Sequence, residues 1–226
     1  LEEAKKIYAF VKNSFKCNGH RGIYLTTGVK ETFKNKNGSV ADVNLLLTTM
    51  LRHENMQANP VILSTRSNGF ANEIYPLINR YNYVICRLDI DGKSYFLDAS
   101  EPYLGFNKLP EYCYNGAART INKEVEPVYF FADSLKESKF TNAMLFSDEK
   151  KPGKWTGTLT TILGYYESNN LRDKFIDNGK EAFEKKLKES YSGDFSIDDI
   201  KYEDEKDGEK PIRMSHKITN AGDNRE

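Results

Sequence analysis

The stretch 38–66 constrains the fold more than any other part of the chain. Its first half repeats apolar residues at helical spacing, which predicts a helix buried inside a domain. These residues are Val40, Val43, Leu46, Leu47, Met50 and Leu51. Ser39 precedes the run as a candidate N-cap, and Asp42, three residues later, can complete a capping box. The apolar triplet 61–63 then predicts a short core strand.

The clearest β signal follows at 81–98. Residues 81–90 are rich in aromatic and β-branched types, Asp91-Gly92 is typical of a two-residue hairpin turn, and 94–98 can return as the partner strand. An amphipathic helix is expected at 2–15. Together these elements predict an α+β fold, in which two helices pack on a mainly antiparallel sheet.

The composition changes after about residue 146, where a charged stretch with Pro152 suggests a domain boundary. We therefore expect a core domain at 1–148 and a smaller C-terminal segment at 149–226. The segment reads as β-rich with two short helices, at 169–176 and 180–191. Its expected strands are 156–166, 195–202 and 212–218.

Charge and residue content exclude several classes of protein. Lys plus Arg equals Asp plus Glu, at 33 each, so no excess of positive charge favours nucleic acid. No apolar run approaches the roughly 20 residues of a membrane helix, so no transmembrane segment is expected. The three histidines, at 20, 53 and 216, lack the paired spacing of a metal site, so no metal and no cofactor is expected. The chain begins at Leu1 rather than Met, and we expect it to be a piece of a longer protein or a processed one.

Three strings occur in an order that resembles the transglutaminase-like superfamily: the helix ending Met-Leu-Arg at Arg52, Tyr-Asn-Tyr-Val-Ile around Tyr83, and Leu-Asp-Ala-Ser around Asp98. The resemblance implies a papain-like core with a cysteine–histidine–aspartate triad. It implies Val40 at the cysteine position, Tyr83 at the histidine position and Asp98 as the aspartate. It further implies a bacterial subgroup located in the periplasm or at the cell surface, in which neighbouring domains of the same chain flank the core.

By this resemblance, two of the three catalytic groups are replaced. Valine has no nucleophilic atom, and a phenol with an ordinary pKa of about 10 is a poor general base near neutral pH. We therefore expect a catalytically inactive binding or scaffolding module in which the Tyr83 hydroxyl donates to Asp98. A retained cleft would take a peptide or a glycan, and its candidate residues are Ser39, Val40, Tyr81, Tyr83 and Asp98. Ser39 is interpreted as a helix cap and not as a nucleophile.

Two other functions stay open at this point. The first is a thiol hydrolase or acyltransferase that uses a non-standard cysteine, such as Cys113 in its predicted loop. Cys17, Cys86 and Cys113 are widely separated and are interpreted as single thiols, without a disulfide framework. The second is a purely structural spacer domain that has no ligand.

Overall fold

The computed structural model describes residues 1–149, 151, 153–191 and 195–220, and divides into two compact units, Leu1–Lys136 and Glu137–Glu226. Each unit combines helices with an antiparallel sheet, so the predicted α+β class is confirmed. The division comes earlier than the boundary expected at 148/149, because strand β8 (Phe140–Ser147) pairs with β9 (Trp155–Ile162) in the second unit. The charged stretch around 148–154 therefore connects two strands of one hairpin.

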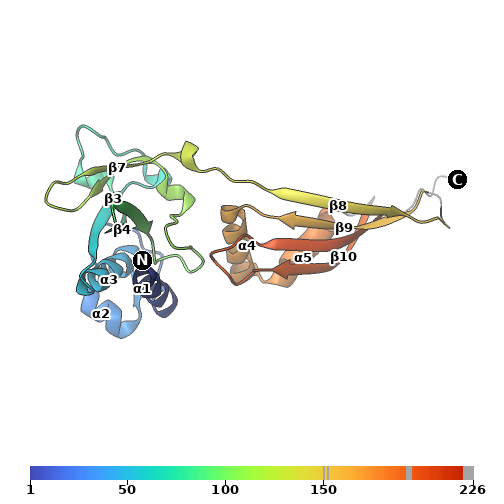
Figure 1. The fold of residues 1–226 in the computed structure, drawn as a ribbon, viewed down its shortest axis with the longest axis horizontal. Helices are drawn as coiled ribbons and strands as arrows, with labels where there is room; N and C mark the ends of the chain where they lie inside the picture. The colour runs from blue at the N-terminus through green and yellow to red at the C-terminus, as the bar shows by residue number, and fades with distance from the viewer. Residues whose placement is uncertain (150, 152, 192–194, 221–226) are drawn as a thin grey trace. The chain divides into compact units, whose positions relative to one another are not determined.

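The first unit is built on a five-stranded sheet in the order β5-β4-β3-β6-β7, with every neighbouring pair antiparallel (Figure 1). The strands are β3 (Gln57–Leu63), β4 (Tyr83–Ile90), β5 (Lys93–Leu97), β6 (Gly116–Thr120) and β7 (Pro127–Phe130). The predicted hairpin joins β4 to β5. Asp91 and Gly92 adopt φ values of 50° and 73°, as this kind of two-residue turn requires.

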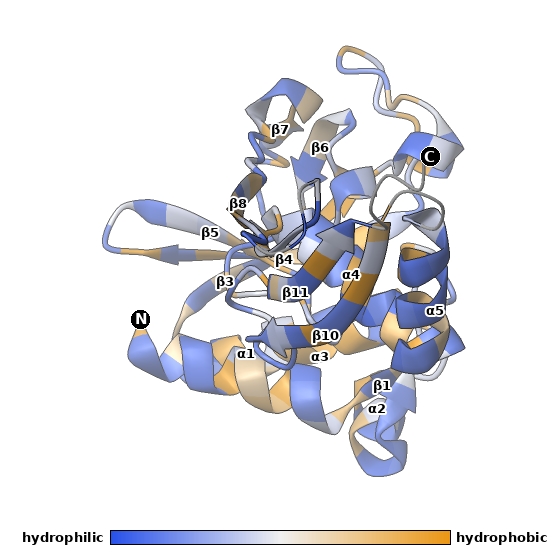
Figure 2. Ribbon diagram, turned by 90° about the vertical axis from the view of Figure 1, so that its right-hand side faces the viewer, coloured by the Kyte–Doolittle hydropathy of each residue, from blue (hydrophilic) through white to orange (hydrophobic). Residues whose placement is uncertain are grey.

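Helix α3 (Val40–His53) packs on β3 and β4, and α1 (Glu2–Ser14) packs against α3. Ser39 and Asp42 form the predicted capping box at the start of α3. Figure 2 shows hydrophobic and hydrophilic positions alternating along α1, whose Ala4 and Val11 are fully buried. The remaining short elements are β1 (Lys16–Cys17), α2 (Val29–Asn35), β2 (Asn37–Gly38) and the 3₁₀ turns Arg66–Asn68, Ile78–Arg80, Glu111–Cys113 and Ala132–Ser134.

The second unit has a four-stranded antiparallel sheet in the order β10-β11-β9-β8. Its remaining elements are α4 (Tyr165–Asn178), α5 (Lys180–Ser190), β10 (Phe195–Glu203) and β11 (Arg213–Asn220). The first helix starts earlier than predicted, because Gly164 ends the preceding extended segment and acts as the N-cap of α4. Within the described ranges, no helix has both the length and the apolar character needed to cross a bilayer.

Candidate functional site

Val40 is the first residue of α3, and its backbone N–H already has a hydrogen-bond partner. The Val40 backbone N–H donates to the carbonyl of His20 at 3.1 Å. The Val40 side chain is buried in a cluster that also contains Tyr83 and Cys113. An apolar side chain therefore fills the start of the helix, where the macrodipole would stabilise a thiolate.

The Ser39 hydroxyl both donates and accepts a hydrogen bond within the N-terminal cap of α3. Ser39 Oγ accepts from the backbone N–H of Asp42 at 3.1 Å and donates to Asp42 Oδ2 at 2.8 Å. Asp42 also accepts from the backbone N–H of Thr26 at 2.9 Å and from the Thr26 hydroxyl, which ties the loop before α2 to the helix. Burial alone would raise the pKa of Asp42, but these hydrogen bonds from Thr26 and Ser39 bring it well below its usual range. Ser39 is thus a helix cap, as predicted, in a tight structural network.

Tyr83 and Asp98 meet across the hairpin, and the expected hydrogen bond between them is present. The Tyr83 hydroxyl donates to Asp98 Oδ2 at 2.9 Å, and both residues have no exposed surface. Asp98 Oδ1 accepts from Asn44 Nδ2 at 2.8 Å and from the Ser100 hydroxyl at 2.6 Å. Among the described residues, the side chains that donate to this buried carboxyl group are therefore neutral.

Asn44 joins the helix to the hairpin, and the sequence patterns gave no prediction for it. Besides Asp98, its amide nitrogen donates to the Val84 carbonyl at 2.9 Å, and its amide oxygen accepts from the Ala99 N–H at 2.8 Å. Asn44 holds strands β4 and β5 at a fixed distance from α3. The available signal was a lone amide inside an otherwise apolar helix, since such a side chain must find partners when it is buried.

Burial raises the pKa of the Tyr83 phenol well above its usual value, and the nearby Asp98 charge raises it further. The phenol therefore stays protonated near neutral pH and can donate a hydrogen bond, but it cannot accept a proton from a nucleophile.

A second phenol, from Tyr112, lies 3.1 Å from the Tyr83 hydroxyl oxygen. Tyr112 donates to Glu101 Oε1 at 2.7 Å, and the Arg21 guanidinium lies 4.1 Å from the centre of its ring. Arg21, Glu101 and Tyr112 form the rim of the site, and none of them was among the residues predicted to line it.

The five cleft candidates are all buried, at 5 % exposure or less: Ser39, Val40, Tyr81, Tyr83 and Asp98. Val40 and Tyr83 share one cluster, and Tyr83 contacts Asp98. Tyr81 lies in another cluster, with Ala41 of α3. At the rim, Arg21 is exposed and Tyr112 and Glu101 are half-buried.

None of the three thiols has the surroundings of a nucleophile. Burial raises the pKa of Cys86 to about 12, and burial together with the Asp98 and Glu101 charges raises that of Cys113 well above its usual value. Cys17 is half-buried, and burial raises its pKa as well. Across the described part of the chain, no hydrogen bond joins a cysteine to a histidine, and no group of three or more His, Cys, Asp or Glu side chains could hold a metal ion.

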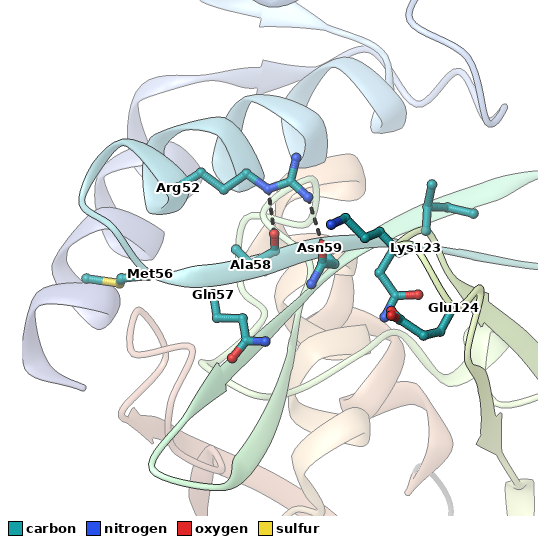
Figure 3. Close-up of a pocket in the computed structure, with 9 residues that line it drawn as sticks. Arg52, Met56, Gln57, Ala58, Asn59, Lys123 and Glu124 are labelled. Carbon is teal, nitrogen blue, oxygen red and sulfur yellow. Dashed lines mark hydrogen bonds between the residues drawn. The ribbon is translucent and has the colours of Figure 1, made fainter.

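A separate polar hollow lies at the other end of α3 (Figure 3). It encloses about 430 Å³ between the end of the helix, the start of β3 and the loop after β6. Arg52 is held in place there, donating to the Ala58 carbonyl at 2.6 Å and to Asn59 Oδ1 at 2.8 Å. Figure 3 shows Lys123 reaching toward the same side chains, with Glu124 beside it. None of the described residues that line the hollow is aromatic.

Comparison with known proteins assigns no family. No family model matches the chain, and no curated protein matches it. One solved structure that it resembles is described as a "putative protease" from Parabacteroides distasonis, with a TM-score of 0.43 and 9 % sequence identity. The match covers 97 % of this chain and 45 % of that one, so the chain spans less than half the length of that protein.

Proposed function

We propose that the chain is a catalytically inactive, transglutaminase-like module that binds or scaffolds within a longer extracytoplasmic bacterial protein. One observation carries the proposal. The Tyr83 hydroxyl donates to Asp98 at 2.9 Å, while Val40 stands at the start of α3 in the same buried cluster. Acyl transfer in this superfamily requires a thiolate and an imidazole, and these positions supply neither. The location and the longer chain rest on the sequence resemblance alone.

A peptide suits the rim of the site better than a glycan does. Sugars commonly stack on aromatic faces, but the Arg21 guanidinium lies over the ring of Tyr112 at 4.1 Å. Arg21 and the half-buried Glu101 place opposite charges at this rim. A peptide, with backbone donors and acceptors and side chains of either charge, can use both groups.

The connection between β3 and β4 supports a peptide ligand. Five of its large apolar side chains are more than half exposed: Phe70 (80 %), Ile74 (77 %), Tyr75 (72 %), Leu77 (57 %) and Ile78 (54 %). In the same connection, Ala71 packs in a cluster with Ala41 of α3. The start of this connection therefore lies beside the end of the helix that carries Val40. A concentration of exposed apolar side chains of this kind marks an interaction surface.

Peptide binding can be tested on an array of 12-residue peptides of varied sequence. We expect the wild-type chain to bind a subset rich in apolar residues, and Tyr75→Ser to lose most of that binding. Ile176→Ser is the matched control, because Ile176 is similarly exposed, at 60 %, but lies in the second unit. Equal binding by both variants, or no binding by the wild type, would contradict the proposal, and the second result would favour the spacer function.

Inactivity has its own test. The chain should incorporate no fluorescent amine into casein and should cleave no casein, before or after treatment with iodoacetamide. Of its thiols, only Cys17 should be alkylated in the folded protein, and slowly, because Cys86 and Cys113 are buried. Turnover that disappears on alkylation would establish the thiol-enzyme alternative instead.

A further inference from the structure

Strand β8 (Phe140–Ser147) forms one edge of the second unit's sheet (Figure 1). Among the described residues it pairs with β9 alone, and all eight of its residues are exposed. The register with β9 runs unbroken from Phe140 opposite Ile162 to Ser147 opposite Trp155. A regular edge strand offers its outward backbone N–H and C=O groups to any other strand that can lie beside it.

The side chains of β8 also favour pairing of this edge with another strand. Phe140, Met144, Leu145 and Phe146 are apolar and are exposed by 61 %, 56 %, 52 % and 62 %. They lie on both faces of the sheet, because consecutive residues of a strand point in opposite directions. The strand contains no Lys, Arg, Asp, Glu or Pro, in a chain with 29 % charged residues. Charges, prolines and bulges are the usual devices that keep an edge from pairing, and β8 has none of them.

The strand at the opposite edge of the same sheet, β10, has features that hinder pairing with a further strand. Strand β10 carries four charged residues: Asp198, Asp199, Lys201 and Glu203. Its register with β11 shifts between Asp198 and Lys201, and Asp199 there has a φ of 50°. One edge of the sheet is thus blocked by charge and by a bulge, while the other is regular and uncharged.

We propose that β8 pairs with β8 of a second copy of this chain, antiparallel about a twofold axis. The pairing would join two four-stranded sheets into one of eight strands and would cover both open edges at once. A second copy fits because the strand is uncharged, so no like charges meet when it pairs with itself. With Ala143 on the axis, Phe140 faces Phe146 of the second copy, which makes an aromatic pair, and Thr141 faces Leu145 of the second copy.

The first test is light scattering during size-exclusion chromatography of the full chain across a range of concentrations. We expect a dimer whose dissociation constant rises at least tenfold in Met144→Lys, since burying the ammonium group beside a second strand is costly. Thr158→Lys is the matched control, because Thr158 is also exposed and lies opposite Met144, but on β9, one strand in from the edge. A wild-type monomer at every concentration would overturn the proposal, and so would equal behaviour of the two variants.

The second test fixes the partner strand and the register. Residues that face each other in an antiparallel pair have Cα atoms about 4.5–5.5 Å apart, which suits a disulfide. With Cys17→Ser removing the half-buried native thiol, Ala143→Cys should form a covalent dimer under mild oxidation, and Thr158→Cys should not. Absence of the Ala143→Cys dimer, or cross-linking of β8 to a different protein only, would refute self-pairing.

Discussion

In the first unit the buried Asp98 is surrounded by side-chain donors from several elements, whereas in the second the buried Arg172 is surrounded mainly by carbonyl oxygens of one loop. Their exposed fractions are 0 % and 2 %. Asp98 accepts from Asn44 on α3, from Tyr83 on β4 and from Ser100. It therefore ties a helix to a hairpin.

Arg172 on α4 shapes the backbone of the loop between β10 and β11. Its guanidinium donates to the carbonyls of Asp204 at 2.9 Å, Asp207 at 2.7 Å and Lys210 at 2.7 Å. It also donates to the Glu205 carbonyl at 3.0 Å. The comparison shows two ways to bury a charge among neutral dipoles, one that fixes side chains and one that fixes a loop.

His216, on β11, is also buried, but unlike Asp98 and Arg172 its side chain is not hydrogen-bonded among the described residues. It is 2 % exposed, and neither ring nitrogen has a hydrogen-bond partner within the described residues. Among the described residues, buried polar atoms without a hydrogen-bond partner occur in both units, since Tyr81 and Arg119 of the first unit each have one. Substitutions at the three positions measure how much each arrangement contributes to stability.

Among these substitutions, the largest loss of stability is expected at Arg172. Replacing it with Met keeps the volume but removes the donors from several loop carbonyls, so the free energy of unfolding of the second unit should fall by about 3 kcal/mol. Trp155 is the only tryptophan and lies on β9, so its fluorescence in a urea titration reports this unit. Arg172→Lys keeps the charge without the planar fork and should lose about half as much. An unchanged urea midpoint in Arg172→Met would show that the loop does not depend on the guanidinium.

A smaller effect is expected at Asp98. In Asp98→Asn one oxygen becomes an NH₂ group that faces the existing donors, which should cost about 2 kcal/mol of the stability of the first unit. Hydrogen exchange at the amides of β4 should speed up accordingly, while Trp155 fluorescence in urea should not change. Tyr83→Phe is the matched control, since it removes one donor and leaves the carboxylate intact, at about 1 kcal/mol. If Asn were tolerated better than Phe, the carboxylate would not be the centre of the network.

Local signals of the sequence were sufficient for the frame of the first unit. The Ser39–Asp42 cap and the Asp91-Gly92 turn depend on residues next to each other in the chain, so pattern alone predicts them. The hydrogen bond between Tyr83 and Asp98 was predictable because the two strands of a hairpin fix which residues lie close together.

Local sequence patterns could not predict contacts between segments that are distant in the chain. Asn44 and Asp98 are 54 positions apart, and nothing in the helix pattern indicates that partner. The Arg21–Tyr112 contact at the rim brings together two connecting segments and was missed for the same reason. Strand β8 went unpredicted because its apolar residues point to both faces, which erases the alternation that marks a half-buried strand.

The smallest effect is expected at His216 and depends on pH. Burial lowers the pKa of His216 in the folded protein, whereas the unfolded chain binds a proton at an ordinary pKa of about 6.5. The unfolded state therefore binds more protons below that pH, so the second unit should lose stability as the pH falls from 7.5 through 6.5 towards the lowered pKa. Urea midpoints followed by Trp155 fluorescence check this. In His216→Phe, which keeps a ring to pack against Tyr191, the midpoint should vary less over this range. An equal slope in both proteins would mean that the unpartnered imidazole does not distinguish this unit from the fully satisfied network around Asp98.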